Sequence, residues 1–427
     1  MNSYNFTSLL ITGFLLILVI LLNYILIVEA QNLAVKINWS VLSNPIGGPS
    51  YAHAICETGE HIYIVGKHGK YGRIEIRYKI NGALLKDWIA KEDSYFIDCV
   101  IFNGKFYVLD QGWKIWVFDL NLNLITSTQK NTKGLSYSIA FYDNYIYVAG
   151  VEHLDYYDGS WRVEKWKAED LSFVKEYSSN PTPRYDLIYS IGINPITKQL
   201  WVIGFEDSLI NLRVEILDLD LNLIKVAGKD EENHLINSLM LSNVKPLYLS
   251  KYMPIAMSVV FDEDGYAYVS RHAYIAKYDK YGNKIALKKV QNWPSIDKLL
   301  YANNYIYAAA SELLDKYRSH VLYIFDKELN EINKIVLNRY TFFNIQEDSY
   351  FGAGKMAFDG KNLYIAGSVE KLWTVMWITY SLSFGQEKQE MIMNYLFISI
   401  IIVAIVASVA LIFFIKRKFF SFSKSFI

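Results

Sequence analysis

Histidines and cysteines are the side chains of this sequence best suited to metal binding and to nucleophilic chemistry. The histidines are His53, His61, His68, His153, His234, His272 and His320, and the cysteines are Cys56 and Cys99. His53, Cys56 and His61 lie close together, but a closed zinc site needs four ligands. No ligand spacing repeats elsewhere in the chain, so the sequence predicts no metal and no cofactor.

Three acidic residues precede Gly265 in the segment FDEDGYAY, Phe261–Tyr268, as acids do in calcium loops. The segment lacks the ligands that an EF-hand supplies at its fifth and twelfth positions. A plain hairpin turn explains the same residues, and this is the interpretation that we prefer.

Sequence marks of several enzyme classes are absent. The chain has no G-x-S-x-G nucleophile elbow and no phosphate-binding loop. It also has no vicinal cysteines and no sialidase box of the form Ser-x-Asp-x-Gly-x-Thr-Trp. Carboxylates lining a channel stay open as an alternative, because sequence does not show their geometry. The motifs favour a protein that is not an enzyme, and they leave the question uncertain.

The elements that would position such side chains follow a repeat. Short β-like runs such as IYIVG and IYVAG recur, and their aromatic residues are Tyr63, Tyr107, Tyr147, Trp201, Tyr268, Tyr307 and Tyr364. Hairpin signals such as Asn103-Gly104 precede these runs, and second turns such as Asn81-Gly82 follow them. Two hairpins in a repeat of about 40–55 residues predict the four-stranded blades of a β-propeller. The 34 Tyr, 23 Phe and 10 Trp agree with an all-β chain.

Two stretches carry a resemblance to a known class, Ile146–Phe173 (IYVAGVEHLDYYDGSWRVEKWKAEDLSF) and Tyr274–Lys289 (YIAKYDKYGNKIALKK). They resemble the propeller repeats of secreted bacterial and archaeal proteins, which pair a YVAG strand with a K-Y-D-x-x-G-N strand and turn. Kelch and NHL-like repeats are a lesser match, since the double glycine of kelch is missing. The resemblance covers about residues 50–382. It implies a fold without an activity, because propellers include both binding modules and enzymes.

The seventh repeat lacks its outermost strand. It supplies strand A near Gly354–Phe358, B at Leu363–Gly367 and C at Trp373–Leu382. Asn32–Leu42 is the one unassigned β-like segment, and we expect it to pair with strand C and close the ring. Closure would cover a sheet edge that otherwise promotes aggregation. The prediction is a seven-bladed propeller; a six-bladed ring with a stray hairpin is the alternative.

Both ends of the chain are hydrophobic. Leu9–Val28 holds no charge, and Val28 and Ala30 suit signal-peptidase cleavage before Gln31, yet no basic residue precedes it and it is long for a signal core. Residues 1–31 are therefore either a signal peptide or an N-terminal membrane anchor. Asn394–Ile415 is long enough for a transmembrane helix.

Charge then sets the orientation. Lys416, Arg417 and Lys418 place the tail, residues 416–427, in the cytoplasm by the positive-inside rule. The predicted order is an extracellular propeller at 32–384, a stalk at 385–393 and a membrane helix at 394–415. The chain would be a single-pass protein of the cell membrane, or a two-pass protein if the first segment is retained.

Loop positions predict which face of the propeller binds a partner. The A–B and C–D turns lie on one face, from which both chain ends leave toward the membrane. The B–C loops and D–A connections lie on the other face, and the long ones are Lys67–Gly72, Val151–Trp161, Lys229–Met253, Ser311–His320 and Asn338–Gly352. Their aromatic residues, the candidate binding residues, are Tyr71, Tyr156, Tyr157, Trp161, Tyr317, Tyr340, Phe342, Phe343 and Tyr350.

Two covalent modifications are also predicted. Outside the cell, Cys56 and Cys99 can form a disulfide. Their offsets from Tyr63 and Tyr107 differ by one residue, which puts them on opposite faces of their strands, so a disulfide and two free thiols both stay open. Asn38-Trp39-Ser40 is an N-glycosylation sequon inside the expected closing strand.

The function that this pattern favours is a membrane-anchored binding or scaffold module at the cell surface. Its partner would be an extracellular protein or a glycan. The alternative is a tethered hydrolase or lyase that uses the mouth of the propeller channel. The balance of 43 basic and 43 acidic residues argues against a nucleic-acid partner.

Overall fold

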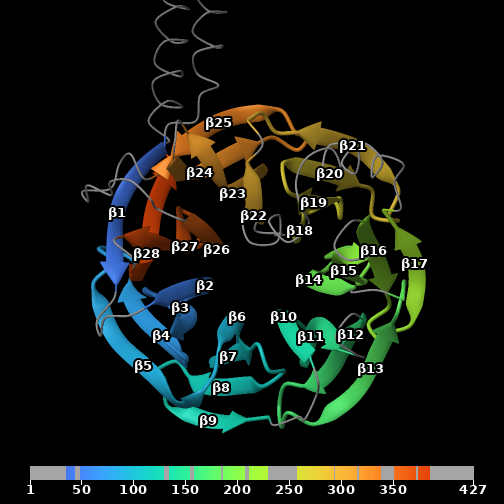
Figure 1. Cartoon of the computed structure of the whole chain (residues 1–427), viewed down its shortest axis with the longest axis horizontal. Helices are drawn as coiled ribbons and strands as arrows, with labels where there is room; N and C mark the ends of the chain where they lie inside the picture. Colours follow the sequence, from blue (N-terminus) through green and yellow to red (C-terminus); the bar gives the residue numbers. More distant parts are fainter. Residues whose placement is uncertain are drawn as a thin grey trace, which may run out of the picture. The chain divides into compact units, whose positions relative to one another are not determined.

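The computed structural model of the chain describes residues 35–43, 49–128, 134–153, 158–183, 186–206, 211–228, 257–292, 294–314, 317–337, 351–371 and 374–384. Within these ranges the regular elements are β-strands, and seven sheets of four antiparallel strands form a ring (Figure 1). The prediction of a seven-bladed all-β propeller is confirmed. The ring belongs to one compact unit, Ile37–Ser383.

No helix in the described ranges has the length and apolar character needed to cross a membrane. The hydrophobic segments Leu9–Val28 and Asn394–Ile415 lie outside those ranges.

Each blade runs from an innermost strand A at the centre of the ring to an outermost strand D at the rim (Figure 1). Blade 1 consists of β2 (Ser50–Thr58), β3 (His61–His68), β4 (Tyr71–Tyr78) and β5 (Leu84–Asp93). Blade 2 consists of β6 (Phe96–Phe102), β7 (Lys105–Asp110), β8 (Ile115–Asp119) and β9 (Leu124–Ser127). Blade 3 consists of β10 (Gly134–Tyr142), β11 (Tyr145–His153), β12 (Gly159–Lys167) and β13 (Phe173–Ser179). Blade 4 consists of β14 (Leu187–Ile193), β15 (Leu200–Glu206), β16 (Asn211–Leu217) and β17 (Leu223–Ala227). Blade 5 consists of β18 (Met257–Phe261), β19 (Ala267–Arg271), β20 (Tyr274–Tyr278) and β21 (Lys284–Lys289). Blade 6 consists of β22 (Ser295–Ala302), β23 (Tyr305–Leu314), β24 (Tyr317–Phe325) and β25 (Glu331–Val336). Blade 7 consists of β26 (Phe351–Phe358), β27 (Asn362–Lys371), β28 (Thr374–Phe384) and β1 (Val35–Ser43).

The B strands are buried on both faces because each blade is packed between two neighbours. In β11, Ile146 and Val148 pack in a cluster shared with blade 2, and Tyr147 and Ala149 pack in a cluster shared with blade 4. A strand covered on both faces has apolar residues at every position rather than at alternate ones. This packing explains why the repeated runs of the sequence are continuously hydrophobic.

In four of the blades the repeated tyrosine joins its blade to the next. Its phenol donates a hydrogen bond to a main-chain carbonyl in the C–D turn of the following blade. The pairs are Tyr63–Leu120 (3.0 Å), Tyr107–Ala168 (3.1 Å), Tyr147–Leu219 (3.0 Å) and Tyr268–Lys327 (3.2 Å). In blade 4 the same position is Trp201, whose ring packs edge-on against Tyr278 of blade 5.

Three of the C–D turns that receive these bonds, those that begin at Asp119, Asp218 and Asp326, share an Asp-x-x-x-Asn pattern with the C–D turn of blade 5. In the first, Asp119 accepts the main-chain N–H groups of Asn121 and Asn123, and its other oxygen accepts the Asn123 side-chain amide. The same bonds recur at Asp218, Asp279 and Asp326. Aspartate side chains that accept N–H groups further along the chain stabilise tight turns, so each carbonyl acceptor is held in place.

Strand β1 closes the ring, as the sequence predicts for Asn32–Leu42. It pairs with β28 and is the D strand of blade 7. The Trp39 indole donates to the carbonyl of Lys79 in blade 1 at 2.8 Å. A Cβ at Gly82 would lie 2.7 Å from the Trp39 ring, so glycine makes room for it. At the end of β1, the Ser43 hydroxyl donates to the buried Glu75 of blade 1.

We predict that Tyr147→Phe lowers the free energy of unfolding by about 1–2 kcal/mol, because it removes the bond to the Leu219 carbonyl and leaves that acceptor without the phenol. The control is Tyr281→Phe, at a turn residue that is 63% exposed. Denaturant unfolding of both variants measures the difference. Equal effects of the two substitutions would contradict a role for this bond.

Candidate binding site in the central channel

The innermost strands converge on the centre of the ring, and a β-bulge interrupts most of them. Register shifts occur in β2, β6, β10, β14, β22 and β26. A bulge inserts a residue and redirects the side chains around it. In each blade, one residue of the innermost strand pairs with, or lies level with, the residue two positions after the repeated aromatic residue of the B strand. We call these residues the inner ring: Ala54, Asp98, Ser138, Ser190, Ser258, Lys298 and Lys355.

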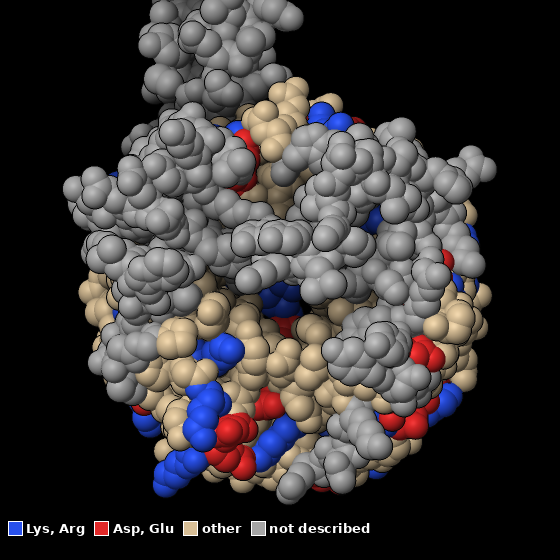
Figure 2. Space-filling model, viewed as in Figure 1, with Lys and Arg blue, Asp and Glu red and all other residues tan. Residues whose placement is uncertain are grey.

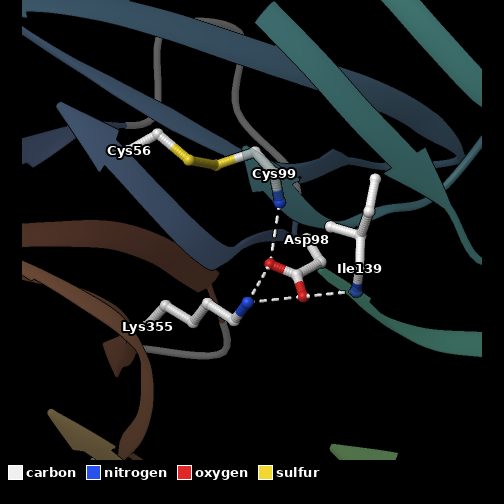
Figure 3. The surroundings of a disulfide bond; sticks show 5 residues. All are labelled: Cys56, Asp98, Cys99, Ile139 and Lys355. Carbon is white, nitrogen blue, oxygen red and sulfur yellow. Dashed lines mark hydrogen bonds and ion pairs between the residues drawn. A yellow bond between two sulfur atoms is a disulfide. The ribbon is translucent and has the colours of Figure 1, made fainter. Parts of the chain in front are cut away.

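Asp98 joins three blades (Figure 3). The Lys355 ammonium of blade 7 lies 2.5 Å from both carboxylate oxygens of Asp98 in blade 2. The main-chain N–H of Ile139 in blade 3 donates to the same carboxylate at 3.0 Å. Blade 1 stands between blades 7 and 2 in the ring, so the ion pair passes in front of the innermost strand of blade 1 and lies in the channel.

Two serines of the inner ring repeat part of this arrangement. The Ser138 hydroxyl accepts the N–H of Ile191 at 3.3 Å, and the Ser190 hydroxyl accepts the N–H of Val259 at 3.4 Å. In blades 2, 3 and 4, an inner-ring oxygen therefore accepts the N–H of the next blade. These side chains stabilise the contacts between blades, and the charged residues lie on the side of the channel formed by blades 6, 7, 1 and 2.

Lys298 of blade 6 differs from Lys355. Its ammonium makes no hydrogen bond and no ion pair within the part of the chain that the structure describes. Burial and, to a smaller extent, the positive charge of Lys355 lower the pKa of this amine to about 8, although Asp98 and Asp297 oppose both effects. Asp297 is buried and accepts the hydroxyls of Ser295 (3.3 Å) and Ser311 (3.0 Å).

An aromatic cluster lies at the start of the innermost strands, toward the B–C loops. The His53 ring is 4.8 Å from that of Tyr95 and stacks with Tyr51 at 6.3 Å. The Lys67 ammonium lies 4.1 Å from the ring centre of Tyr95 and 5.0 Å from that of Tyr51. Burial, together with the positive charges of Lys67 and Lys298, lowers the pKa of His53 to about 3, so its imidazole is neutral at pH 7. Its Nε2 is buried without a hydrogen bond among the described residues.

Figure 2 shows Lys or Arg atoms beside Asp or Glu atoms in the hollow at the centre of the ring. Polar groups that converge in a concavity next to aromatic rings are typical of a ligand site. The described residues contain no group of three His, Cys, Asp or Glu that would hold a metal ion. In the segment FDEDGYAY, Asp262 accepts the N–H groups of Asp264 and Tyr266, which is the plain hairpin turn that we preferred.

Of the aromatic candidates, the structure describes two side chains. Trp161 lies in β12, is fully buried and donates its indole N–H to the carbonyl of Phe205, so it presents no ring at the surface. Tyr71 opens β4, is partly buried, and has the Lys70 ammonium 5.3 Å from its ring centre. Tyr317 begins β24, and its side chain is outside the description. Outside the described residues altogether are Tyr156, Tyr157, Tyr340, Phe342, Phe343 and Tyr350.

Three of the predicted long loops are wrong, because strand pairing extends into them and leaves shorter connections. The segment Lys67–Gly72 is a tight turn between β3 and β4, because pairing continues through His68 and Tyr71. The strands β11 and β12 pair as far as His153 and Gly159, and β23 and β24 as far as Leu314 and Tyr317. Backbone pairing extends these hairpins beyond the point where the hydrophobic pattern ends. The connections at 229–256 and 338–350 lie outside the described residues.

A disulfide joins Cys56 to Cys99 across blades 1 and 2 (Figure 3), with 6.4 Å between the Cα atoms. The two cysteines do lie on opposite faces of their own sheets. Neighbouring blades present opposite faces to each other, so this offset is what a bridge between them requires. Closing a 43-residue separation stabilises the fold by about 4 kcal/mol in the chain-entropy account.

Asn38 is exposed on β1, which a glycosylation acceptor requires. Its side-chain amide donates to the Asn362 side chain at 3.1 Å and to Ser381 at 3.4 Å. Glycosylation of this sequon stays a prediction.

The inner ring was missed by the sequence reasoning, although a signal for it exists. In five blades its residue stands nine positions before the repeat aromatic: Ala54, Asp98, Ser138, Lys298 and Lys355. Alignment of the repeats on their aromatics would have placed these residues at one level. Their meeting in the channel needs the closed ring, which the alignment does not contain.

Comparisons with known proteins support the fold. No protein-family model and no curated protein matches the sequence. The chain is similar to the β-propeller domain of Cps50 (Swd1) from Myceliophteria thermophila, with 11% identity and a TM-score of 0.54 over 82% of this chain and 100% of that one. The WD40 domain of Neurospora crassa Pan2 has 11% identity and a TM-score of 0.55, over 83% of this chain and 97% of that chain.

A streptogramin B lyase is similar at 11% identity and a TM-score of 0.53, with 81% of this chain and 98% of that chain covered. At these identities the likeness concerns the fold alone.

We predict that Asp98→Asn lowers the free energy of unfolding by about 2–4 kcal/mol, because it leaves the Lys355 ammonium without its anion in the channel. The matched control is Asp93→Asn, which breaks the exposed Lys70–Asp93 pair, whose side chains are 64% and 69% exposed, and should cost less than about 0.5 kcal/mol. Denaturant unfolding at pH 7 compares them. A change at Asp98 as small as at Asp93 would show that the ion pair contributes little.

Taken together, the geometry describes a seven-bladed β-propeller with a charged channel flanked by aromatic rings.

Proposed function

We propose that the chain is a membrane-anchored binding module of the cell surface, with its propeller outside the cell. Its partner is an extracellular protein or a glycan. The observation that carries this proposal is the closure of the ring by β1, because it brings together the two strand ends that continue into the hydrophobic segments.

The ends of the ring lie on the face of the A–B turns. The Ser383 hydroxyl donates to the Asn38 side chain at 2.9 Å, and Asn38 donates to Asn362 at 3.1 Å. Asn362 directly follows the A–B turn of blade 7. Both hydrophobic segments therefore continue from strands that end at this face, which supports an orientation with the turn face toward the lipid. Residues Lys416–Lys418 support a cytoplasmic tail.

The opposite face is the one available to a partner under this orientation. The aromatic cluster of Tyr51, His53 and Tyr95 lies at the start of the innermost strands, toward this face, and the inner ring lies near the middle of those strands. The connection that carries the candidate aromatic residues at 340, 343 and 350 lies outside the described residues, but the end of β25 and the start of β26, which it joins, are at this face. Aromatic rings with nearby polar groups are enriched in binding surfaces for proteins and ligands.

A tethered hydrolase or lyase is the second candidate, and the carboxylates of the channel argue against it. Asp98 is held by Lys355 and by the Ile139 N–H, and Asp297 by two serine hydroxyls. Carboxylates that are engaged in this way are poorly placed to transfer a proton or to attack a substrate. This favours binding over catalysis.

The test replaces the connections 154–157 and 338–350 with Gly-Ser linkers of equal length in the full chain. We expect at least a tenfold loss in capture of extracted surface proteins or glycans. The melting temperature should change little, because the two segments connect β11 to β12 and β25 to β26 and the substitution leaves these strands unchanged. The control replaces the turn Asn81-Gly82 on the other face by Asp-Gly. Undiminished capture by the linker variant would contradict binding through this face.

A further inference from the structure

We propose that the channel of this propeller binds the carboxylate of an acidic sugar, with Lys298 as the residue that pairs with it. The proposal deepens the binding function proposed above and rests on it. The ligand class follows from the charge, the hydrogen bonds and the rings around Lys298.

Charged side chains of both signs lie near Lys298. The ammonium groups of Lys67, Lys298 and Lys355 act on this region, against the carboxylates of Asp98 and Asp297. Lys355 is neutralised by Asp98 at 2.5 Å, and Asp297 is buried and accepts two hydroxyls. Lys298 is thus the cation of the inner ring without a bonded anion among the described residues.

An amine in this position is unfavourable for the fold alone. A partly buried ammonium without a hydrogen-bonded partner loses part of its hydration, and no other interaction compensates the free energy that this costs. At two other inner-ring positions the side chain stabilises the packing between blades: the hydroxyls of Ser138 and Ser190 each accept a main-chain N–H from the next blade. Lysine cannot accept such a bond, so its presence is explained by a ligand that supplies the missing anion.

The chemistry favours a carboxylate over a phosphate. One lysine offers a single point charge, which suits a monoanion, whereas phosphate sites commonly use arginine forks or several donors. The tyrosines near the channel mouth can cover the apolar face of a sugar ring. Tyr51 and Tyr95 flank His53, and the rings of Tyr137 and Tyr189 lie 5.4 Å apart at the bulges of blades 3 and 4. All four tyrosines are partly exposed.

The affinity should also depend on pH in a defined direction. The ligand binds the protonated amine, whose pKa in the free protein is lowered to about 8. Above that pH the free protein loses the proton, so the affinity should fall about tenfold for each further pH unit until the pKa of the complex is reached. Below pH 7 the affinity should be constant as long as the sugar carboxylate stays ionised.

The experiment is calorimetric titration of the full chain in detergent with a tetrasaccharide that contains glucuronic acid, and with the same tetrasaccharide after reduction of its carboxyl groups. The variants are Lys298→Met and, as a matched control on an exposed turn, Lys361→Met. We expect the native chain and Lys361→Met to bind the acidic sugar at least tenfold more tightly than the reduced one. Lys298→Met should bind both equally and weakly.

A second measurement shows whether the variant is folded. Because the substitution removes an unpaired amine, Lys298→Met should melt at a temperature equal to or above that of the native chain at pH 7. A preference for the acidic sugar that survives Lys298→Met would overturn the proposal, as would absence of binding by the native chain. Binding of inorganic phosphate in preference to the acidic sugar would overturn the carboxylate assignment.

The outcomes separate this inference from the function on which it rests. If the native chain fails to bind the sugar but still captures a surface partner through the connections at 154–157 and 338–350, only the channel inference fails. If both fail, the proposed function fails as well.

Discussion

The pairing of β1 with β28 is the constraint on which the rest of the ring depends. Every blade is covered by the blade before it and the blade after it, so a gap between blades 7 and 1 would expose the faces of both. The closing strand also donates from Trp39 to the Lys79 carbonyl and from Ser43 to Glu75. Without β1, the outer edge of β28 would present unpaired backbone groups, which promote association between chains.

Contacts between successive blades follow rules that repeat, and the exceptions to these rules locate the candidate site. Four of the repeat tyrosines donate outward to the next C–D turn. Inner-ring oxygens at Asp98, Ser138 and Ser190 accept from the next blade at the centre. Ala54, Lys298 and Lys355 have no side-chain oxygen at this level, and the two lysines also place a charge there. Asp98 compensates Lys355, whereas Lys298 has no such partner in the described residues. A position that departs from the packing rule without compensation is better explained by binding than by stability.

The fold could be predicted from the sequence because each blade carries a continuously hydrophobic B strand between turn signals, and because the last repeat lacks one strand that the segment before the first repeat can supply. The site could not, for physical reasons. Lys355 and Asp98 are 257 residues apart in sequence and meet only when blades 7, 1 and 2 close around the axis. Trp161 was misplaced because an aromatic residue near a predicted loop has the same local pattern whether it faces solvent or the neighbouring blade.

The most direct test of the central claim is a cross-link between β1 and β28. The Oδ1 atom of Asn38 and the Oγ atom of Ser383 lie 2.9 Å apart. The cysteines of an Asn38→Cys, Ser383→Cys double variant should therefore form a disulfide on mild oxidation of the folded chain. Peptide mass spectrometry should recover the linked fragments in high yield. A folded chain in which these cysteines stay free, or link only between molecules, would contradict closure of the ring by its N-terminal strand.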